Sequence, residues 1–429
     1  MACEQVTLQD VCELIVDCPH TSTKDEGVGY PLIRTPNVGR GRLILTDVHR
    51  VSQDVYERRV SRAVPRQGDL ILAREAPAGN VAIVPPGIEV CLGQRTMLLR
   101  PDSSFVVPEY LNYYLNAPEQ RDRMLRLANG ATVSHINVAD IRNMPVQLPS
   151  RGEQSKVAEL LNVLDDKIDL NNRLNDYLEQ LVDGKFQELF GGLNFNATLS
   201  DVAEITMGQS PAGSSYNEEG AGIIFYQGRG EFGWRFPKRR LYTTEPKRLA
   251  CEGDVLMSVR APVGDLNVAF ENCCIGRGLA AIHSETPSFA LYLMRFLKPQ
   301  LEAYNGEGTV FGSINGKALK SLEVALPSHN EVMQFESFAA PIDALIRSNE
   351  NETRKLNNLR NYLLPKLMSG EIDVSKVDLT QLTNNHLAGR MHWSNVIRVR
   401  AIHAVHSQQS QIPAYESVPK VPILHVAPP

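Results

Sequence analysis

The sequence predicts an α+β protein with two globular mixed α/β domains in tandem. Long α-helices separate and follow these domains and are expected to pair as an antiparallel coiled coil around a pseudo-twofold axis. Three observations support this fold class: the chain of 429 residues repeats itself once, each copy ends in a long helical pattern, and each copy carries a basic stretch. A repeat of roughly 180 residues is too long for a solenoid unit, so whole domains are duplicated.

The duplication is clearest in two runs that begin with Gly-Asp. GDLILAREAPAGNVAIV starts at Gly68 and GDVLMSVRAPVGDLNVAF starts at Gly253. Apolar runs joined by Ala-Pro-x-Gly turns are typical of paired strands. We therefore expect strands at 70–73, 81–84, 255–259 and 267–270. A helix should follow each pair of strands, at about 108–127 and about 289–303.

Both copies end in a helix that begins with a capping box. Ser150 and Ser328 each open an S-x-x-E motif, in which the Ser caps the third amide and the Glu reaches back to the cap. Apolar residues follow at heptad-like spacing, which favours helices that pack on each other rather than into a globular core. The residues expected at helix or partner contacts are Val157, Leu161, Leu164, Ile168, Leu174, Leu178, Leu181, Ile342, Leu345, Leu356, Leu359 and Leu363.

Polar and proline residues interrupt the helical stripes. Asn171 and Asn349 are counterparts in the repeat, and a buried Asn at such a position can fix the register of two helices. Pro341 is expected to kink the second helix or to leave a short first segment. Five parts follow from these boundaries: a globular domain at 1–149, a spacer helix at 150–192, a globular domain at 193–327, a spacer helix at 328–372 and an atypical tail at 373–429.

The net charge of −5 conceals two basic stretches. Residues 34–66 carry eight Arg against three acids, and residues 229–248 carry seven Lys or Arg against two acids. Lys and Arg side chains can contact the phosphates of DNA. Arg can form two hydrogen bonds with guanine, and Gln or Asn can form two with adenine, so such stretches indicate binding to double-stranded DNA. Alternatively, each basic stretch forms a hydrated surface that binds no nucleic acid. The residues expected to contact DNA are Arg34, Asn37, Arg40, Arg42, Arg74, Gln227, Arg229, Arg235, Lys238, Arg239, Arg240 and Arg260.

The helices are long enough to hold two DNA-binding domains apart. About 38 residues at ~1.5 Å each make a rod of roughly 57 Å. DNA repeats its groove about every 34–36 Å, so two domains one to two turns apart would read a split sequence with an unread gap. We therefore expect the helices to set the spacing between two half-sites.

No catalytic motif accompanies these features. Glu245-Pro246-Lys247 has the spacing of a nuclease Glu-x-Lys but lacks a clear partner Asp, and no phosphate loop, nucleophile elbow or glycine-rich cofactor loop occurs. The seven Cys lack CxxC spacing, and five of the ten His lie beyond residue 380, so no metal site is expected. No apolar stretch approaches the ~20 residues that span a bilayer, and no leader is apparent, which favours the cytoplasm. We therefore expect a binding protein without catalytic residues or a cofactor of its own.

Several motifs recur in one order, each copy followed by a long helix: Pro31–Thr35 and Ile223–Gly228, the two Gly-Asp runs, Cys-x-Gly-Arg-Gly at Cys274, and LLPKLMSGEI from Leu363. Over roughly residues 5–375 the chain thereby resembles the specificity subunit of type I restriction-modification systems. The resemblance implies two target-recognition domains, helices that hold two methyltransferase subunits, and an assembly with restriction and translocase subunits. Those partners would use S-adenosylmethionine, ATP and Mg.

Two other interpretations stay open. A stand-alone nuclease predicts metal-dependent cleavage that is lost on Glu245→Ala, and a protein-protein scaffold predicts that neither basic stretch affects any nucleic acid. The end of the chain also departs from the family, which usually stops soon after Ser-Gly-Glu-Ile. Here the chain continues from about Asp378 without helical or strand periodicity. We expect a disordered extension, with a frameshift or fusion as the alternative.

Overall fold

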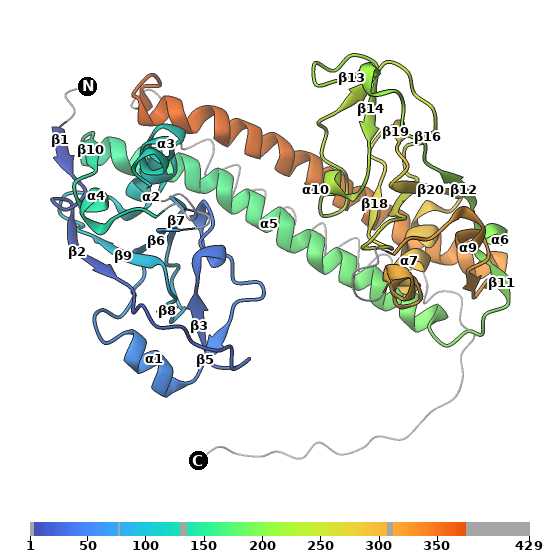
Figure 1. The fold of residues 1–429 in the computed structure, drawn as a ribbon, viewed down its shortest axis with the longest axis horizontal. Coiled ribbons are helices and arrows are strands. Elements are labelled where there is room, and N and C mark those ends of the chain that lie inside the picture. The colour runs from blue at the N-terminus through green and yellow to red at the C-terminus, as the bar shows by residue number, and fades with distance from the viewer. Residues whose placement is uncertain (1–3, 76–77, 129–134, 307–311, 375–429) are drawn as a thin grey trace, which may run out of the picture. The chain divides into compact units, whose positions relative to one another are not determined.

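A computed structural model describes residues 4–75, 78–128, 135–306 and 312–374 (Figure 1). The chain divides into two compact units. The first unit contains the residues up to Asp166 and those from Asn358 onward, and the second unit is Lys167–Asn357. The mixed α/β fold with two tandem globular parts and long helices agrees with the prediction. The boundary between the units falls inside both long helices, so the five-part division stays a prediction. The tail lies outside the described residues after Val374.

The first unit is built on a five-stranded sheet of order β2-β9-β6-β7-β4. Its strands are β2 (Cys12–Asp17), β4 (Gly41–Arg42), β6 (Leu70–Ala73), β7 (Val81–Ile83) and β9 (Thr96–Pro101). A second sheet of order β5-β3-β8 and a β1-β10 pair are formed by β1 (Glu4–Thr7), β3 (Tyr30–Ile33), β5 (Arg50–Val51), β8 (Cys91–Leu92) and β10 (Pro145–Leu148). The short helices are α1 (Gln53–Arg59), α2 (Pro108–Asn116), α3 (Pro118–Leu127) and α4 (Val138–Arg142).

The second unit repeats this plan. Its four-stranded sheet has the order β12-β20-β17-β18, with β12 (Glu204–Met207), β17 (Val255–Ser258), β18 (Leu266–Val268) and β20 (Leu279–His283). The other sheet has the order β13-β15-β14-β19-β16, with β13 (Tyr216–Asn217), β14 (Ile223–Tyr226), β15 (Tyr242–Thr243), β16 (Leu249–Ala250) and β19 (Cys273–Ile275). The remaining elements are the β11 (Ala197–Thr198) and β21 (Glu323–Val324) pair, α6 (Leu199–Val202), α7 (Pro287–Phe296), α8 (Lys298–Glu302) and α9 (Gly316–Lys320).

The Gly-Asp runs form strands as predicted, but the helices that follow them are broken. β6, β7 and β17 match the expected ranges to within one residue, whereas β18 lies one to two residues earlier. The single helix expected at 108–127 is two helices, because Ala117 is extended (ψ 144°) ahead of Pro118. The counterpart is likewise divided into α7 and α8, since Pro299 supplies no N–H to continue α7.

The two long helices are α5 (Arg151–Phe190) and α10 (His329–Met368), each of 40 residues. Both capping boxes are present: the Ser150 hydroxyl donates to Glu153 Oε2 at 2.8 Å, and the Ser328 hydroxyl donates to Glu331 Oε2 at 2.7 Å. The short first segment expected at Pro341 does not occur, because α10 is one helix through this residue. Phe335 and Ala339, both fully buried in the core of the second unit, hold this stretch in place.

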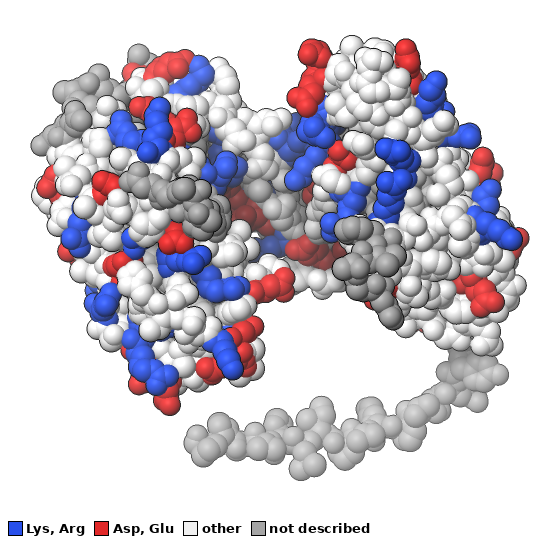
Figure 2. Space-filling model, viewed as in Figure 1, with Lys and Arg blue, Asp and Glu red and all other residues white. Residues whose placement is uncertain are grey.

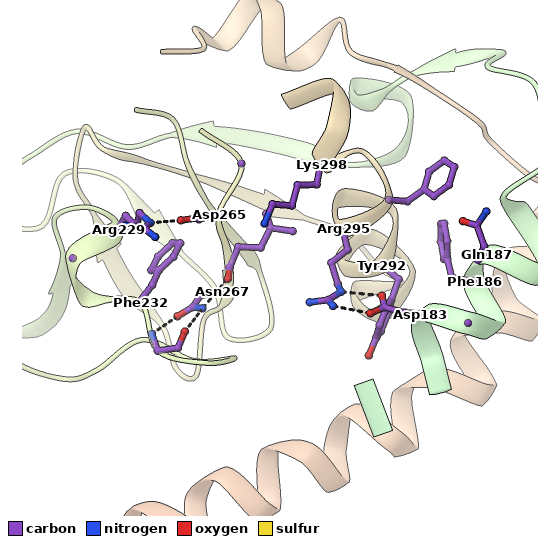
Figure 3. A pocket seen from close by; sticks show the side chains of 16 residues that line it. Asp183, Phe186, Gln187, Arg229, Phe232, Asp265, Asn267, Tyr292, Arg295 and Lys298 are labelled. Atoms are coloured by element: carbon purple, nitrogen blue, oxygen red, sulfur yellow. Dashed lines mark hydrogen bonds and ion pairs between the residues drawn. The ribbon is translucent and has the colours of Figure 1, made fainter. Parts of the chain in front are cut away.

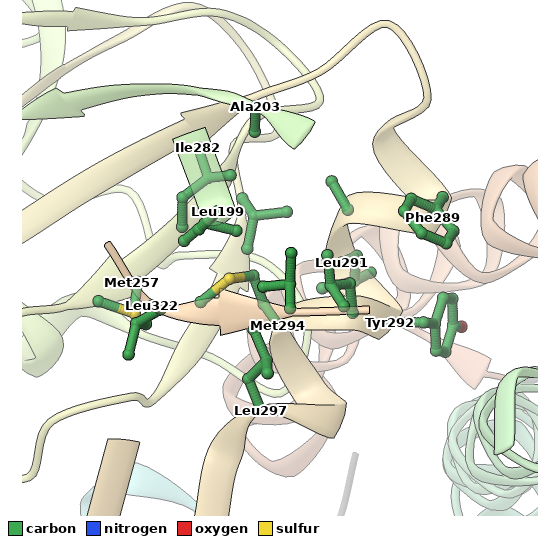
Figure 4. Close-up of a cluster of buried hydrophobic side chains, with 14 of the residues drawn as sticks. Leu199, Ala203, Met257, Ile282, Phe289, Leu291, Tyr292, Met294, Leu297 and Leu322 are labelled. Carbon is green, nitrogen blue, oxygen red and sulfur yellow. The ribbon is translucent and has the colours of Figure 1, made fainter. Parts of the chain in front are cut away.

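Both helices bury much of their apolar stripe in the globular cores, which the heptad pattern did not predict. Val157 and Leu161 pack in the first unit's core together with Leu367 of α10. In the second unit, Phe186 of α5 and Phe335 of α10 join a core that Figure 4 shows around Met257, Phe289 and Met294.

The remaining residues expected between the helices are unevenly buried. Leu164 and Ile168 are buried. Half-buried positions are Leu174, Leu178, Ile342, Leu345, Leu356 and Leu363. Leu181 and Leu359 are 53% and 45% exposed, so they do not contribute to an interhelical core. A straight helix drifts from a strict heptad by ~20° per repeat, which carries the ends of such a stripe towards solvent.

Buried Asn side chains link α5 and α10 within the second unit. Asn349 Nδ2 donates to Asn175 Oδ1 at 2.8 Å, and Asn171 Nδ2 donates to Thr353 Oγ1 at 3.3 Å. Residue numbers rise along one helix as they fall along the other, so the helices run antiparallel here. Asn171 and Asn349 are both buried, but each bonds to a residue one turn along the opposite helix rather than to the other.

The second capping box predicts a pH-dependent contribution to stability. Hydrogen bonds from the Ser328 hydroxyl and backbone N–H lower the pKa of Glu331 from its ordinary value of 4.5. The ionised cap therefore stabilises the helix above the unfolded-state pKa, and this contribution is lost as the pH falls through the lower folded-state pKa. We expect Ser328→Ala to lower the melting temperature at about pH 7 and to lower it less at about pH 3. If Ser328→Ala lowered the melting temperature equally at both pH values, this role of the cap would be contradicted.

Candidate nucleic-acid interface

The basic stretch of the second unit forms a loop between β14 and β15. It starts at Gln227, directly after the buried end of β14, and its basic side chains from Lys238 to Arg240 are exposed. Arg260 is also exposed and follows β17. Lys and Arg side chains lie among acidic ones over the visible face of this unit (Figure 2). The loop therefore presents cations to solvent from the end of a central strand.

Three of these cations already have acidic neighbours. Arg229 pairs with Asp265. Arg239 Nε lies 2.6 Å from Glu271 Oε1, and Arg240 Nη2 lies 3.2 Å from Glu231 Oε1. The three Arg side chains are 45–59% exposed, and exposed ion pairs contribute little to stability. Glu271 is 38% exposed whereas Glu231 is 8% exposed, so a phosphate group can compete at low cost for Arg239 in particular.

Three other predicted side chains make no polar contact within the described part of the chain. Among the described residues, the side chains of Gln227, Lys238 and Arg260 have neither a hydrogen bond nor an ion pair with the rest of the chain. Trp234 lies in the same loop and is 42% exposed. Its exposure adds a flat aromatic surface beside the cations, which only the folded loop reveals.

Arg235 has a different place from its neighbours in the loop. Its side chain is 4% exposed, and its guanidinium group contacts Glu179 of α5 at 3.1 Å and Asp343 of α10 at 3.3 Å. It also donates to the hydroxyl of Tyr292 at 3.2 Å. Arg235 thus ties the loop to both long helices of its own unit. We remove it from the candidate interface, because a buried guanidinium engaged by two carboxylates cannot reach a ligand outside.

The first unit contributes fewer exposed cations. Arg40 is exposed, and Arg42 Nη2 contacts Asp166 Oδ1 of α5 at 2.8 Å. Arg34 is half-buried with its Nε shielded from solvent. Asn37 is 4% exposed and donates to the Ile44 carbonyl at 3.1 Å, so its amide supports the loop. Arg34, Asn37 and Arg40 lie in one loop between β3 and β4, and Arg42 is the last residue of β4.

Arg74 is the third predicted contact residue that the structure buries, after Arg235 and Asn37. It is 4% exposed, and its Nη1 donates to both carboxylate oxygens of Asp17, at 2.7 and 2.6 Å. Its Nε donates to the Ile136 carbonyl at 3.0 Å. Arg74 therefore links β2 to the segment before α4, and we remove it from the candidate interface as well.

A pocket of about 900 Å³ lies beside the second unit's loop. Figure 3 shows Arg229 and Asp265 on one side and the Arg295–Asp183 pair on the other, with Lys298 reaching in from α8. Its floor is fixed by Asn267, which exchanges hydrogen bonds with the backbone of Gly233. The pocket joins the loop to α5 and α7 in a polar cleft of mixed charge.

Each unit anchors its globular part to a long helix through one Tyr–Asp pair. Tyr113 of α2 donates to Asp165 of α5 at 2.8 Å, and Tyr292 of α7 donates to Asp343 of α10 at 3.0 Å. Burial is the main cause that raises the pKa of each hydroxyl. Both therefore stay protonated donors at neutral pH. The anchor is thus conserved between the two copies while the loop residues above it differ.

The family model described as type I restriction modification DNA specificity domain matches residues 2–180 and 196–361. The MjaX type I restriction enzyme specificity subunit of Methanocaldococcus jannaschii is 31% identical over 396 residues, covering 86% of this chain and 93% of the relative. The MjaIX subunit of the same organism is 22% identical over 374 residues, covering 77% and 84%.

A solved structure shares the fold. The crystal structure of a type I restriction-modification system S subunit from M. genitalium has a TM-score of 0.57 at 16% identity, covering 86% of this chain and 96% of that chain. In the described part of the chain, no helix combines the length and apolarity that crossing a membrane requires.

Proposed function

We propose that this chain, which belongs to the type I restriction modification DNA specificity family, recognises a bipartite DNA sequence, each repeat reading one half. The observation that carries the proposal is the contrast between the two copies. They share the Gly-Asp strands, the Tyr–Asp anchor and the capped helix, but their loops present different polar side chains. One scaffold with two different loops suits two different half-sequences better than a palindrome.

The contacts of the loops support this assignment at the level of residues. Lys238, Arg239 and Arg240 are exposed together. Glu271, the neighbour of Arg239, is 38% exposed, so a phosphate can replace it. Gln227 offers the amide that base readout requires, without an internal partner among the described residues. In the first repeat, Arg40 is the predicted contact residue whose side chain is exposed.

We further propose that α5 and α10 form the spacer between the half-sites and the docking surface for two methyltransferase subunits. A helix of 40 residues extends about 60 Å, which spans one to two turns of DNA. The Asn175–Asn349 contact supports an antiparallel coiled coil with a pseudo-twofold axis. Leu181 and Leu359, exposed on α5 and α10, suit contact with a partner. Methyl transfer, with S-adenosylmethionine, and restriction, with ATP and Mg, would belong to the partner subunits.

Co-expression with a cognate methyltransferase subunit tests the recognition function. We expect genome-wide mapping of modified adenines to reveal one split motif, with two specified halves around an unspecified gap. Cells that express the methyltransferase subunit without this chain should lack the motif. A continuous motif would contradict bipartite reading, and no modification would favour a protein-protein scaffold. Metal-dependent cleavage by the purified chain, lost on Glu245→Ala, would instead favour a nuclease.

A further inference from the structure

Cys251, Asp254 and His283 form a cluster at the start of β17 and the end of β20. One ligand atom from each side chain lies within 4.8 Å of the other two. Asp254 is 6% exposed, whereas Cys251 and His283 reach solvent. Asp254 Oδ2 accepts a hydrogen bond from the Cys251 backbone N–H at 2.8 Å, and Asp254 Oδ1 lies 2.6 Å from His283 Nδ1. A thiol, an imidazole and a buried carboxylate therefore converge on one point.

The first unit has different residues at the equivalent position, around Asp69. Gly68 and Gly253 adopt positive φ values of 87° and 91°, so the turn before each following Asp has the same form. Asp69 Oδ2 accepts from the Arg66 N–H at 2.9 Å, as Asp254 does from Cys251. Leu70 pairs with Leu99, and Val255 pairs with Ile282, so the next residues, Arg100 and His283, are equivalent.

The charge balance differs between these two sites. In the first unit, Arg100 donates to both oxygens of Asp69, at 2.9 and 2.8 Å, and neutralises a carboxylate that is 2% exposed. In the second unit, the imidazole of His283 occupies the equivalent position and makes a single contact with Asp254. Unlike a guanidinium group, an imidazole can bind a metal ion through a ring nitrogen. Glu204 lies directly opposite His283 in the β12–β20 ladder and adds negative charge. The second site therefore has one imidazole contact where the first has a guanidinium group that makes two bonds.

We propose that Cys251, Asp254 and His283 bind a zinc ion, which replaces the guanidinium group found in the first unit. Sulfur, nitrogen and oxygen are the three ligand types that Zn²⁺ accepts, and a water molecule would complete a tetrahedral set. The thiol loses its proton on binding, so two negative ligands balance the ion. The zinc ion links the turn before β17 to β20. Sequence spacing did not reveal this site, because its residues come from two distant segments without CxxC.

Cobalt substitution in the full-length, metal-free chain tests the proposal. Co²⁺ bound by a thiolate gives sulfur-to-cobalt charge-transfer absorption, which the five His beyond residue 380 cannot produce. We expect this absorption at one Co²⁺ per chain, displaced by Zn²⁺. Cys251→Ser should abolish it, and His283→Gln should weaken Zn²⁺ binding by more than about a hundredfold. Cys12→Ser and His329→Gln are the matched controls and should leave both signals unchanged.

A second variant keeps the test decisive if the first ones unfold. His283→Arg copies Arg100 of the first unit and should fold without metal. The melting temperature of the wild type should rise with Zn²⁺ by mass action, whereas that of His283→Arg should not. The proposal is overturned if the wild type shows no thiolate-to-cobalt absorption, if Cys251→Ser retains it, or if Zn²⁺ raises the melting temperature of His283→Arg as much as that of the wild type.

Discussion

Replacing Arg235 with alanine is expected to destabilise the second unit by about 3 kcal/mol, because it removes the guanidinium group that contacts two largely buried carboxylates. Glu179 and Asp343 are 17% and 21% exposed, so water screens them poorly. Arg295 still contacts Glu179, and Tyr292 still contacts Asp343. The expected loss of stability therefore lies at the lower end of the range for removing one partner of a buried ion pair. Chemical denaturation of the full chain measures this loss as a change in the free energy of unfolding.

The control for Arg235 is a neighbour in the same loop. Arg239→Ala removes the same kind of side chain, but Arg239 is 45% exposed, so its loss should leave the unfolding free energy within about 0.5 kcal/mol. Arg235→Lys should lie between the two, because an ammonium group cannot bridge both acids as a guanidinium fork does. If Arg235→Ala were as stable as Arg239→Ala, Arg235 would not anchor the loop.

The double change Arg239→Ala and Arg240→Ala is expected to weaken DNA binding by the assembled complex about tenfold at physiological salt. Each lost phosphate contact also reduces the slope of log affinity against log salt by about one, so the slope should fall by about two. Both side chains are about half exposed, but Arg240 pairs with Glu231, which is 8% exposed, so the melting temperature of the double variant is measured beside its affinity to separate lost contacts from lost stability. Titrations of labelled target DNA at several salt concentrations measure both quantities.

The matched control removes the same charge elsewhere in the unit. Lys317→Ala with Lys320→Ala, on the exposed side of α9, changes the net charge equally but leaves the loop intact. We expect a much smaller change in affinity and slope. Equal losses in the two double variants would mean that overall charge, rather than this loop, determines affinity. Unchanged affinity and slope after the Arg239 and Arg240 changes would remove this patch from the interface.

Local patterns predicted most of the secondary structure. The capping boxes at Ser150 and Ser328 gave the starts of α5 and α10, because a cap depends on residues three positions apart. The paired strands of the Gly-Asp runs followed from alternating apolar runs and turns. The divisions at Ala117 and Pro299 were missed, although the prolines were visible, because the apolar pattern continues across them.

The candidate site was predictable only in part. Net charge along the chain located the loop after β14, and its cations at 238–240 are exposed. Charge alone did not distinguish Arg235 or Arg74 from them, because their acidic partners lie far away in the sequence. The same limit applies to Cys251, Asp254 and His283, which meet only after β17 pairs with β20.

The sequence by itself determined the duplication, the family and the order of the elements, since these depend on motifs and spacings along the chain. Only the tertiary structure decided which polar side chains face solvent. Arg235 is buried between two helices while Arg239, four residues later, is 45% exposed. Leu181 and Leu359 likewise fall outside the helix contact despite their heptad positions. The physical reason is that burial and ion pairing depend on partners brought together by folding, and sequence spacing does not report those partners.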